Sequence, residues 1–440
     1  MSLLLAFVAA QTSAGRAARA DDPKRPVPDY DGRGPSPTTA GEVALWVPRL
    51  ILSPFYLVSE YIIREPVGAL ISAAERADVP RILYDFFAFG PDHKAGFAPI
   101  GLLDFGFNPS VGLYFFWDDA FFKGNDLRLH GSTWTSDWQA ISLTDRIHFN
   151  GKDTLTFNAA LVRRPDHVFY GLGPTTVQSN QSRFGEDRLE GRATFDVPLW
   201  RASRVVATVG VRDVKLYHGH FGSDPSLERE SAAGAFPLPY GFDSEYAAQF
   251  NHVLAAVDSR QPRPHSGSGV RVEAEAEQGT DIRRTGSSWV RYAGTAGGFL
   301  DLNEHSRVVS LSVAALFADP LGSQPVPFTE LVTLGGVGPM RGYWQGRLVD
   351  RSAAVATARY LWPIAPFVNG TLEAAVGNVF GEHLSGFRPG LLRLTGALGV
   401  ESVGSLDNAL ELLVGVGTET FDHGTQVDSL VLSLGTNRGF

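Results

Sequence analysis

Apolar and polar residues alternate along the chain from about residue 98 to the C-terminus, and this period of two constrains the fold more than any other feature. In RLEGRATFDV, Leu189, Ala193 and Phe195 alternate with charged or hydroxyl-bearing side chains. GVRVEAEAEQ repeats the pattern, with valines and alanines against arginine and glutamates. Successive side chains of a β-strand point to opposite faces of the sheet. Each such segment therefore predicts a strand with one apolar and one polar face.

The segments and their connections divide the chain into about sixteen predicted strands. Their predicted ranges are 98–107, 110–118, 126–136, 138–149, 153–165, 185–199, 203–218, 250–259, 268–278, 288–301, 306–318, 353–363, 370–380, 391–402, 409–419 and 428–438. Tight connections, such as 150–152 and 200–202, contrast with long ones near 166–184, 219–249 and 319–352. A soluble β-sandwich also alternates, but its turns are short at both ends. Short turns on one side and long loops on the other are typical of an outer-membrane barrel.

Closure is the physical reason for preferring a barrel. Hydrocarbon offers no partner to an unpaired backbone group, so a sheet that spans a bilayer must have no edge. Strands of about ten residues match the tilted crossing length. An even strand number keeps both chain ends in the periplasm. We therefore predict an all-β fold, a 16-stranded antiparallel transmembrane β-barrel preceded by a short helical periplasmic segment.

The N-terminal quarter of the chain has a different composition. Residues 1–20 have an apolar run and a small-residue cleavage pattern, which predict a signal peptide, with a disordered tail as the alternative. Residues 21–40 are proline-rich and polar and predict a disordered linker. Residues 41–97 have helical apolar spacing broken by prolines and predict a helical periplasmic segment before the barrel domain, 98–440. No apolar stretch reaches the roughly 20 residues that a membrane helix needs.

Composition excludes several classes of function. The 440 residues include 38 basic and 47 acidic side chains, for a net charge of −9. This charge argues against a nucleic-acid partner, because phosphate binding requires a basic surface. The chain has no cysteine, so disulfides, thiolate nucleophiles and cysteine zinc sites are excluded.

The C-terminus carries a further outer-membrane feature. A set of leucines shares strand parity with the last residue, so all of them are predicted to face lipid. The set is Leu430, Leu432, Leu434 and Phe440. A terminal aromatic residue on the final strand resembles the sorting signal of Gram-negative barrels.

One long loop carries a glycine-rich motif, LGGVGPMRGYWQG, between the eleventh and twelfth predicted strands. Its motif residues are Gly335, Gly336, Met340, Arg341, Gly342 and Tyr343. The motif resembles loop six of the BamA/TamA-like outer-membrane assembly superfamily, also called the bacterial surface antigen family. YGLG at 170–173, DSRQPRPHSGSG at 258–269 and VGNVF at 376–380 support the resemblance, which covers nearly all of 98–440.

The resemblance implies a role for the loop. In that family the loop folds back into the barrel lumen, and its arginine pairs with an acidic group on the inner wall. The family's acidic position aligns here with Ala375, and an arginine of the next strand aligns with Glu401. Strand parity places Glu373 and Glu401 on the inner face, so we predict that Arg341 pairs with one of them. Gly342 would give clearance and Tyr343 would pack; the alternative is a solvated loop arginine.

The front of the chain departs from the insertases of the family, which carry soluble POTRA domains. Residues 21–97 lack strand alternation and predict no such domain, so the chain resembles short members without them. Recruitment of substrate by β-augmentation is therefore not supported.

No catalytic motif is found: there is no G-x-S-x-G elbow, phosphate loop or H-E-x-x-H. We predict no enzyme activity, cofactor or metal. His218 and His220 lack a third ligand. The inward carboxylates are more typical of a wetted or ion-paired lumen than of acid–base chemistry; they are Glu273, Glu275 and Glu277.

The resemblance favours insertion or translocation of protein or lipid at the outer membrane, through a weak seam between the first and last strands. The expected partners are outer-membrane lipid, nascent outer-membrane proteins and periplasmic factors. Alternatives are a passive channel or structural surface barrel and, least favoured, an outer-membrane lipase.

Overall fold

The computed structural model describes residues 86–440, with gaps at 91, 103–104, 261–266, 284–285, 303–306, 366–367, 403–408 and 438–440. The predicted signal peptide, the linker, most of the helical segment and Phe440 lie outside the described residues. Among those described, no helix is both long enough and apolar enough to cross a membrane.

The described residues form a nearly all-β structure, as the sequence predicts. In chain order the elements are β1 (Ala88–Phe89), β2 (Ala95–Leu102), β3 (Ser110–Trp117), β4 (Asn125–Thr135), β5 (Trp138–Phe149), β6 (Asp153–Phe169), η2 (Gln178–Asn180), β7 (Ser182–Pro198), β8 (Arg204–His218), α6 (Leu227–Ala232), β9 (Tyr246–Asp258), β10 (Gly269–Asp281), β11 (Ser288–Asp301), β12 (Val308–Pro320), η3 (Phe328–Glu330), β13 (Val332–Leu334), β14 (Leu348–Asp350), β15 (Ser352–Ala365), β16 (Val368–Phe380), η4 (Glu382–Leu384), η5 (Pro389–Leu391), β17 (Arg393–Ser402), β18 (Ala409–Thr418), η6 (Phe421–His423) and β19 (Val427–Asn437). Each of the predicted strand ranges overlaps one of the long strands.

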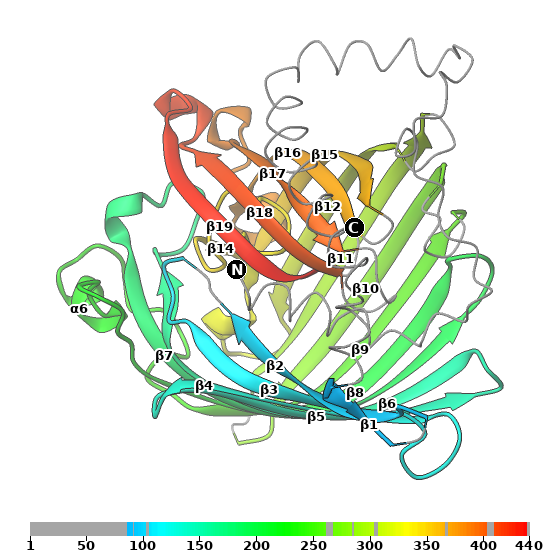
Figure 1. The fold of residues 1–440 in the computed structure, drawn as a ribbon. Coiled ribbons are helices and arrows are strands. Elements are labelled where there is room, and N and C mark those ends of the chain that lie inside the picture. The colour runs from blue at the N-terminus through cyan, green and yellow to red at the C-terminus, as the bar shows by residue number, and fades with distance from the viewer. Residues whose placement is uncertain are drawn as a thin grey trace.

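The long strands form a single antiparallel meander. Each pairs with the next along the chain, and β12 pairs with β15 because β13 and β14 form a separate hairpin inside the intervening loop. In Figure 1 the strands follow one another in colour order round a curved sheet. β2 and β19 are the first and last long strands along the chain, and no register between them is among those described. Closure of the barrel is not seen in these registers.

The start of the sheet differs from the prediction. We expected a helical segment up to residue 97, but β2 begins at Ala95, and the two residues of β1 pair with its first two, Ala95 and Gly96. The run FFAF at 86–89 is apolar without a period, so its spacing alone does not separate a helix from a strand. Phe86 and Phe87 are helical, whereas pairing with β2 makes Ala88 and Phe89 a strand.

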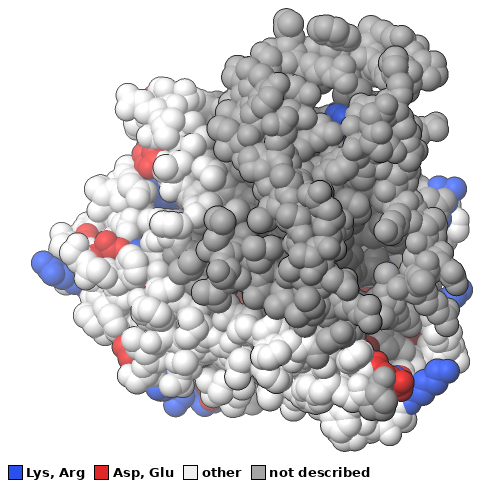
Figure 2. All heavy atoms as spheres, viewed as in Figure 1, with Lys and Arg blue, Asp and Glu red and all other residues white. Residues whose placement is uncertain are grey.

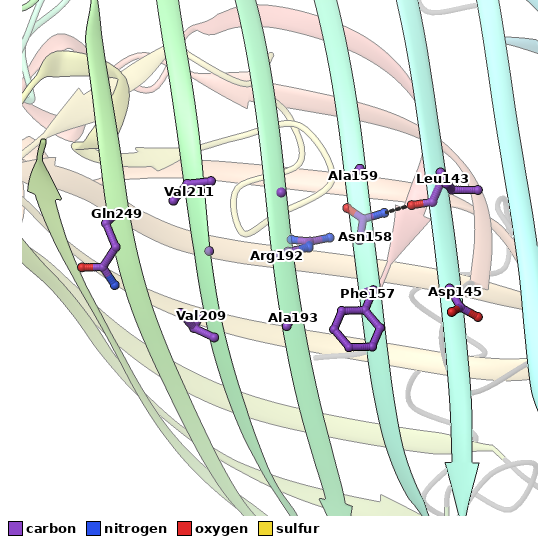
Figure 3. A pocket seen from close by; sticks show the side chains of 12 residues that line it. Leu143, Asp145, Phe157, Asn158, Ala159, Arg192, Ala193, Val209, Val211 and Gln249 are labelled. Atoms are coloured by element: carbon purple, nitrogen blue, oxygen red, sulfur yellow. Dashed lines mark hydrogen bonds between the residues drawn. The ribbon is translucent and has the colours of Figure 1, made fainter. Parts of the chain in front are cut away.

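The two faces of the sheet differ in character. On β8, Val209 and Val211 are exposed on one face, whereas Arg212 and Val214 are buried on the other. Figure 3 shows part of the apolar face, a hollow where Ala193 of β7 lies between Phe157 of β6 and the β8 valines. In Figure 2 most charged atoms of the described surface lie toward its edges. An outer face of apolar side chains is the surface that a bilayer requires.

The hydrophobic core lies between the inner face of the sheet and a loop, not between two layers. Residues 321–351, between β12 and β15, form this segment, which we call the inner loop. Phe328 of the inner loop contacts Phe169 at 5.3 Å and Phe184 at 5.2 Å between ring centroids, both on the sheet. Leu334 and Met340 of the inner loop are fully buried in the same cluster.

Candidate functional site: a clamped inner loop

The motif residues form a tight reversal at the tip of the inner loop. Gly335, Gly336 and Met340 all have positive φ, of 107°, 67° and 67°. The Gly335 amide donates to the Pro339 carbonyl at 2.9 Å, and the Gly336 amide donates to the Tyr343 carbonyl at 2.7 Å. Glycine adopts positive φ at little cost, which explains the Gly-Gly pair at this turn. The reversal carries Arg341 to the wall of the sheet.

Arg341 is buried, with 3% of its side chain exposed, and its Nε lies 3.5 Å from Glu373 Oε2 on β16. Arg359 of β15 lies directly opposite Glu373 in the strand register, with its Nε 3.9 Å from the same oxygen. Arg359 Nη2 also contacts Glu401 Oε2 of β17 at 2.5 Å. The four charges therefore alternate in sign, with Arg341 on the inner loop and the other three on neighbouring strands.

Of the two partners proposed from the sequence, Glu373 is the one beside Arg341, and Glu401 contacts Arg359. Buried charges are tolerated only when paired and hydrogen-bonded. The Glu373 carboxylate supplies the charge partner of Arg341 without exposing it to water.

Glycines on both sides let the loop tip lie flat on β18. A Cβ added to Gly342 would lie 2.1 Å from the Val416 carbonyl oxygen, and one added to Gly415 would lie 2.3 Å from the Arg341 carbonyl oxygen. A Cβ on Gly417 would meet the ring of Tyr343 at 2.4 Å. Real Cβ atoms do not approach other atoms this closely, so the contact requires glycine on the loop and on the strand.

Two further hydrogen bonds tie the loop tip to the last two strands. The Tyr343 hydroxyl donates to the Thr418 carbonyl at the end of β18, and the Ser429 hydroxyl of β19 donates to the Gly342 carbonyl. Tyr343 is fully buried. A buried tyrosine normally finds a partner for its hydroxyl, and here that partner fixes the loop to the sheet.

A second cluster of arginines, which the sequence did not predict, contains Arg347 of the inner loop and Arg393 of β17. Arg347 of the inner loop donates to Asp428 Oδ2 at 2.9 Å and to the Thr176 hydroxyl at 2.6 Å. Arg393 of β17 donates to the Thr176 carbonyl at 2.7 Å and approaches Asp428 at 3.5 Å. Burial lowers the pKa of Arg347, and the nearby Arg393 lowers it further, partly offset by Asp428.

The alternation of faces along the strand could not identify Asp428 as an inward-facing residue. It has the same parity as Leu430, which is exposed, so simple alternation places it on the lipid face. A register shift between Gly417 and Thr418 opposite this point marks a β-bulge. An extra residue in one strand re-aims the side chains beyond it, and Asp428 turns inward.

Glu330 anchors the other end of the inner loop to a distant part of the wall. Its side chain is fully buried. It accepts hydrogen bonds from Arg212 of β8 at 3.0 Å, the Tyr246 hydroxyl of β9 at 2.6 Å and Arg291 of β11 at 3.3 Å. Burial would raise the pKa of Glu330, but the guanidinium groups of Arg212 and Arg291 outweigh it and hold the pKa below its ordinary value. The inner loop is thus fixed to three regions of the inner wall.

The other charged residues named from the sequence are also paired. The three inward glutamates lie beside cations: Glu277 accepts from Arg212 at 2.7 Å, Glu275 lies 3.2 Å from His252, and Glu273 contacts Arg271. They form an ion-paired wall. Leu430 is exposed on the outer face, and the side chains of Leu434 and Phe440 lie outside those described.

The histidine pair is not brought together with a third ligand in the described structure. His218 lies 3.8 Å from Glu228 and His220 lies 3.3 Å from Asp137. The described part of the chain holds one other cluster with metal-ligand side chains: Asp319, Glu382 and His383. Arg351 already contacts its two carboxylates, at 2.9 Å and 3.1 Å. A guanidinium therefore occupies the position of a cation.

The Omp85 superfamily domain model matches residues 121–386. The chain belongs to the Omp85 superfamily. The match includes Glu330, Arg341 and Glu373, whereas Arg393 and Asp428 of the second arginine cluster lie beyond it. No curated protein sequence matches the chain.

Solved structures were also compared with the fold of this chain. BamA from Haemophilus ducreyi, lacking POTRA domains 1–3, is 14% identical with a TM-score of 0.54, and the similarity covers 78% of this chain and 70% of that one. CdiB from Acinetobacter baumannii is 10% identical with a TM-score of 0.48, covering 78% of this chain and 59% of that one. At these identities the likeness to BamA concerns the fold alone.

Proposed function

We propose that this Omp85 protein resides in the bacterial outer membrane and inserts or translocates protein or lipid there, with the clamped inner loop as a fixed part of the machine. The observation that carries the proposal is the pairing of Arg341 with Glu373 inside an Omp85 barrel. A buried ion pair costs desolvation energy and is weak evidence for stability alone. The inner loop is nevertheless held by this pair, by glycine contacts and by a second arginine cluster. We take these several attachments as support for a functional role of the loop's position.

The main alternative is a passive channel or a structural surface barrel. The path of the inner loop argues against a wide channel, because it runs from Glu330 on the β8–β11 wall to Arg341 on the β16 wall. A segment that lies between two separate parts of the wall leaves less room for ions. A channel and an insertase therefore differ in conductance.

The test uses the purified chain reconstituted in phospholipid liposomes. We expect it to accelerate folding of an unfolded test barrel, scored by protease protection, and to give low conductance in planar bilayers. Arg341→Ala should reduce the acceleration, whereas Arg163→Ala, at an exposed ion pair, should not. High stable conductance without assisted folding would favour the channel and contradict the proposal.

We also propose that the protein has no hydrolytic activity. Among the described residues, the clustered carboxylates lie beside arginine or histidine side chains, and no nucleophile is identified beside the histidines. Incubation of the reconstituted protein with labelled phospholipid should release no fatty acid. Release of fatty acid would support an outer-membrane lipase instead.

A further inference from the structure

The connection between β2 and β3 touches the tip of the inner loop, although more than two hundred residues separate them in sequence. Phe107 and Trp344 have ring centroids 5.7 Å apart in an edge-to-face arrangement. Gly106 has a φ of +96°, and a Cβ added there would lie 2.4 Å from the ring of Trp344. The indole therefore lies directly on the backbone of the hairpin formed by β2 and β3, which we call the first hairpin.

A buried arginine holds this contact in place. The guanidinium carbon of Arg183 lies 5.2 Å from the ring centroid of Phe107 and 5.7 Å from that of Trp344. Arg183 itself is fixed by Asp224 at 2.8 Å. The Asn108 amide donates to Asp166 at 2.7 Å, which ties the hairpin connection to β6. Cation–π contacts of this kind strengthen when they are desolvated.

Three consecutive residues of the loop tip thus reach both ends of the meander. Gly342 accepts from Ser429 of β19, and Tyr343 donates to the carbonyl of Thr418 on β18. Trp344 contacts Gly106 and Phe107 of the first hairpin. The loop tip is therefore a side-chain link between these two ends.

We infer that Trp344 is a latch: it holds the first hairpin to a loop that is already fixed to the last two strands, and so sets the separation of the barrel's two ends at the loop side. This deepens the proposed function, because a seam that opens for cargo needs an element that keeps it together at rest. Trp344 is a positioning residue in this scheme. It acts by binding Gly106 and Phe107, not by touching cargo.

The experiment measures the separation directly. The chain has no cysteine, so Val111→Cys on β3 and Leu430→Cys on β19 provide two unique sites for spin labels. Both positions are exposed on the outer face, at 52% and 69%. Distances between the labels are measured in liposomes by pulsed electron paramagnetic resonance. We expect one narrow distribution in the parent protein.

Trp344→Ala should add a second, longer distance and raise the ratio of separated to joined molecules roughly 3- to 10-fold, the effect of losing one aromatic pair. Trp344→Phe retains a ring on Gly106 and should restore most of the short distance. Trp200→Ala is the matched control, because Trp200 is exposed in the turn between β7 and β8. It should leave the distribution unchanged.

Phe107→Ala removes the other half of the contact and should reproduce the effect. Combined with Trp344→Ala it should add little, because both changes break one link. Phe107→Ala also carries the test if Trp344→Ala does not fold, as judged by heat-modifiable migration. Distances that stay unchanged in the folded variants would overturn the latch.

The outcomes separate the latch from the proposed function. The distance measurement needs no cargo and no activity. A shifted distribution in a protein that folds no test barrel would support the latch and contradict the insertase. Assisted folding with unshifted distances would do the reverse.

Discussion

At the scale of single residues, the protein places guanidinium groups where water is excluded and then matches each with a carboxylate. Arg341 is the clearest case, since its partner Glu373 is itself 5% exposed. The charge of either residue is costly to leave alone. Removal of one partner from a buried pair is much more damaging than loss of a surface pair.

We therefore expect Arg341→Ala to lower the free energy of unfolding by about 3–5 kcal/mol, the usual cost of removing one partner from a buried ion pair. Urea unfolding of the barrel in detergent, followed by heat-modifiable migration, measures this change. Arg163→Ala removes an exposed pair with Asp187, in which the arginine is 46% exposed, and should cost less than about 1 kcal/mol. Equal losses in the two variants would show that Arg341 is solvated in the membrane.

Two strand glycines provide a second residue-scale prediction. A Cβ on Gly415 of β18 would lie 2.3 Å from the Arg341 carbonyl oxygen, whereas one on Gly396 of β17 would lie 3.7 Å from its nearest neighbour. Gly415→Ala should displace the loop tip and lower stability by about 1–3 kcal/mol, as overpacking does. Gly396→Ala should be neutral within about 1 kcal/mol.

The same unfolding measurement compares the two glycine variants, and protease cleavage of the inner loop reports whether the tip has moved. Faster cleavage in Gly396→Ala than in Gly415→Ala would contradict the proposed seating of the tip.

At the scale of elements, the inner loop is a long connection held at widely separated points. Its own secondary structure is small: one 3₁₀ turn and the β13–β14 hairpin of three residues per strand. Two-stranded hairpins are marginal alone. The contacts of Glu330, Arg341 and Arg347 with the wall therefore fix the loop conformation, which its short secondary-structure elements could not stabilise alone.

The anchor at Glu330 predicts a pH dependence. Its pKa is held below the ordinary value of 4.5, so the folded state binds the proton less well than the unfolded state. The stabilisation is fully present above pH 4.5 and is lost as the pH falls through the lower folded pKa. We expect the difference in unfolding free energy between the parent and Glu330→Gln to stay constant above that pH and to shrink below it.

Urea titrations at a series of pH values measure this difference. Glu382→Gln is the control, because Glu382 pairs with Arg351 at an exposed site and should change stability little at any pH. A Glu330→Gln difference that grows as the solution is acidified would have the wrong sign for this anchor.

At the scale of the whole molecule, the inner loop occupies part of the space enclosed by the curved sheet. The hydrophobic cluster around Phe328 and the ion pairs of Glu330 lie between that loop and the inner wall. The outer face carries exposed valines and leucines instead. The usual order of a soluble protein, apolar inside and polar outside, is thus partly inverted, as a lipid environment demands.

Replacement of residues 336–346 by a short glycine–serine linker should remove the bridge between the walls. We expect the single-channel conductance in planar bilayers to rise several-fold, because a wider aqueous path carries more ions. A linker of the same kind in place of residues 421–425, at the turn between β18 and β19, is the control and should leave conductance unchanged. A rise in both variants would point to general loosening of the barrel.

Much of the architecture was predictable because it depends on local geometry. The period of two follows from the pleat of any strand, so the faces of β7, β8 and β10 could be assigned before their neighbours were known. The loop motif likewise led to the family, which the match to residues 121–386 confirms. The candidate site was partly accessible by the same parity, which placed both Glu373 and Glu401 on the inner face.

What the sequence by itself determined, then, is the alternation of faces, the succession of strands and the identity of the loop that carries Arg341. The tertiary structure alone decided the rest: that Glu373 and not Glu401 lies beside Arg341, that a bulge turns Asp428 inward, that Glu330 reaches three other strands and that Trp344 rests on Gly106. The physical reason is range. Alternation is encoded between adjacent residues, whereas each of these contacts joins segments far apart in the chain, whose meeting depends on the register and curvature of the whole sheet.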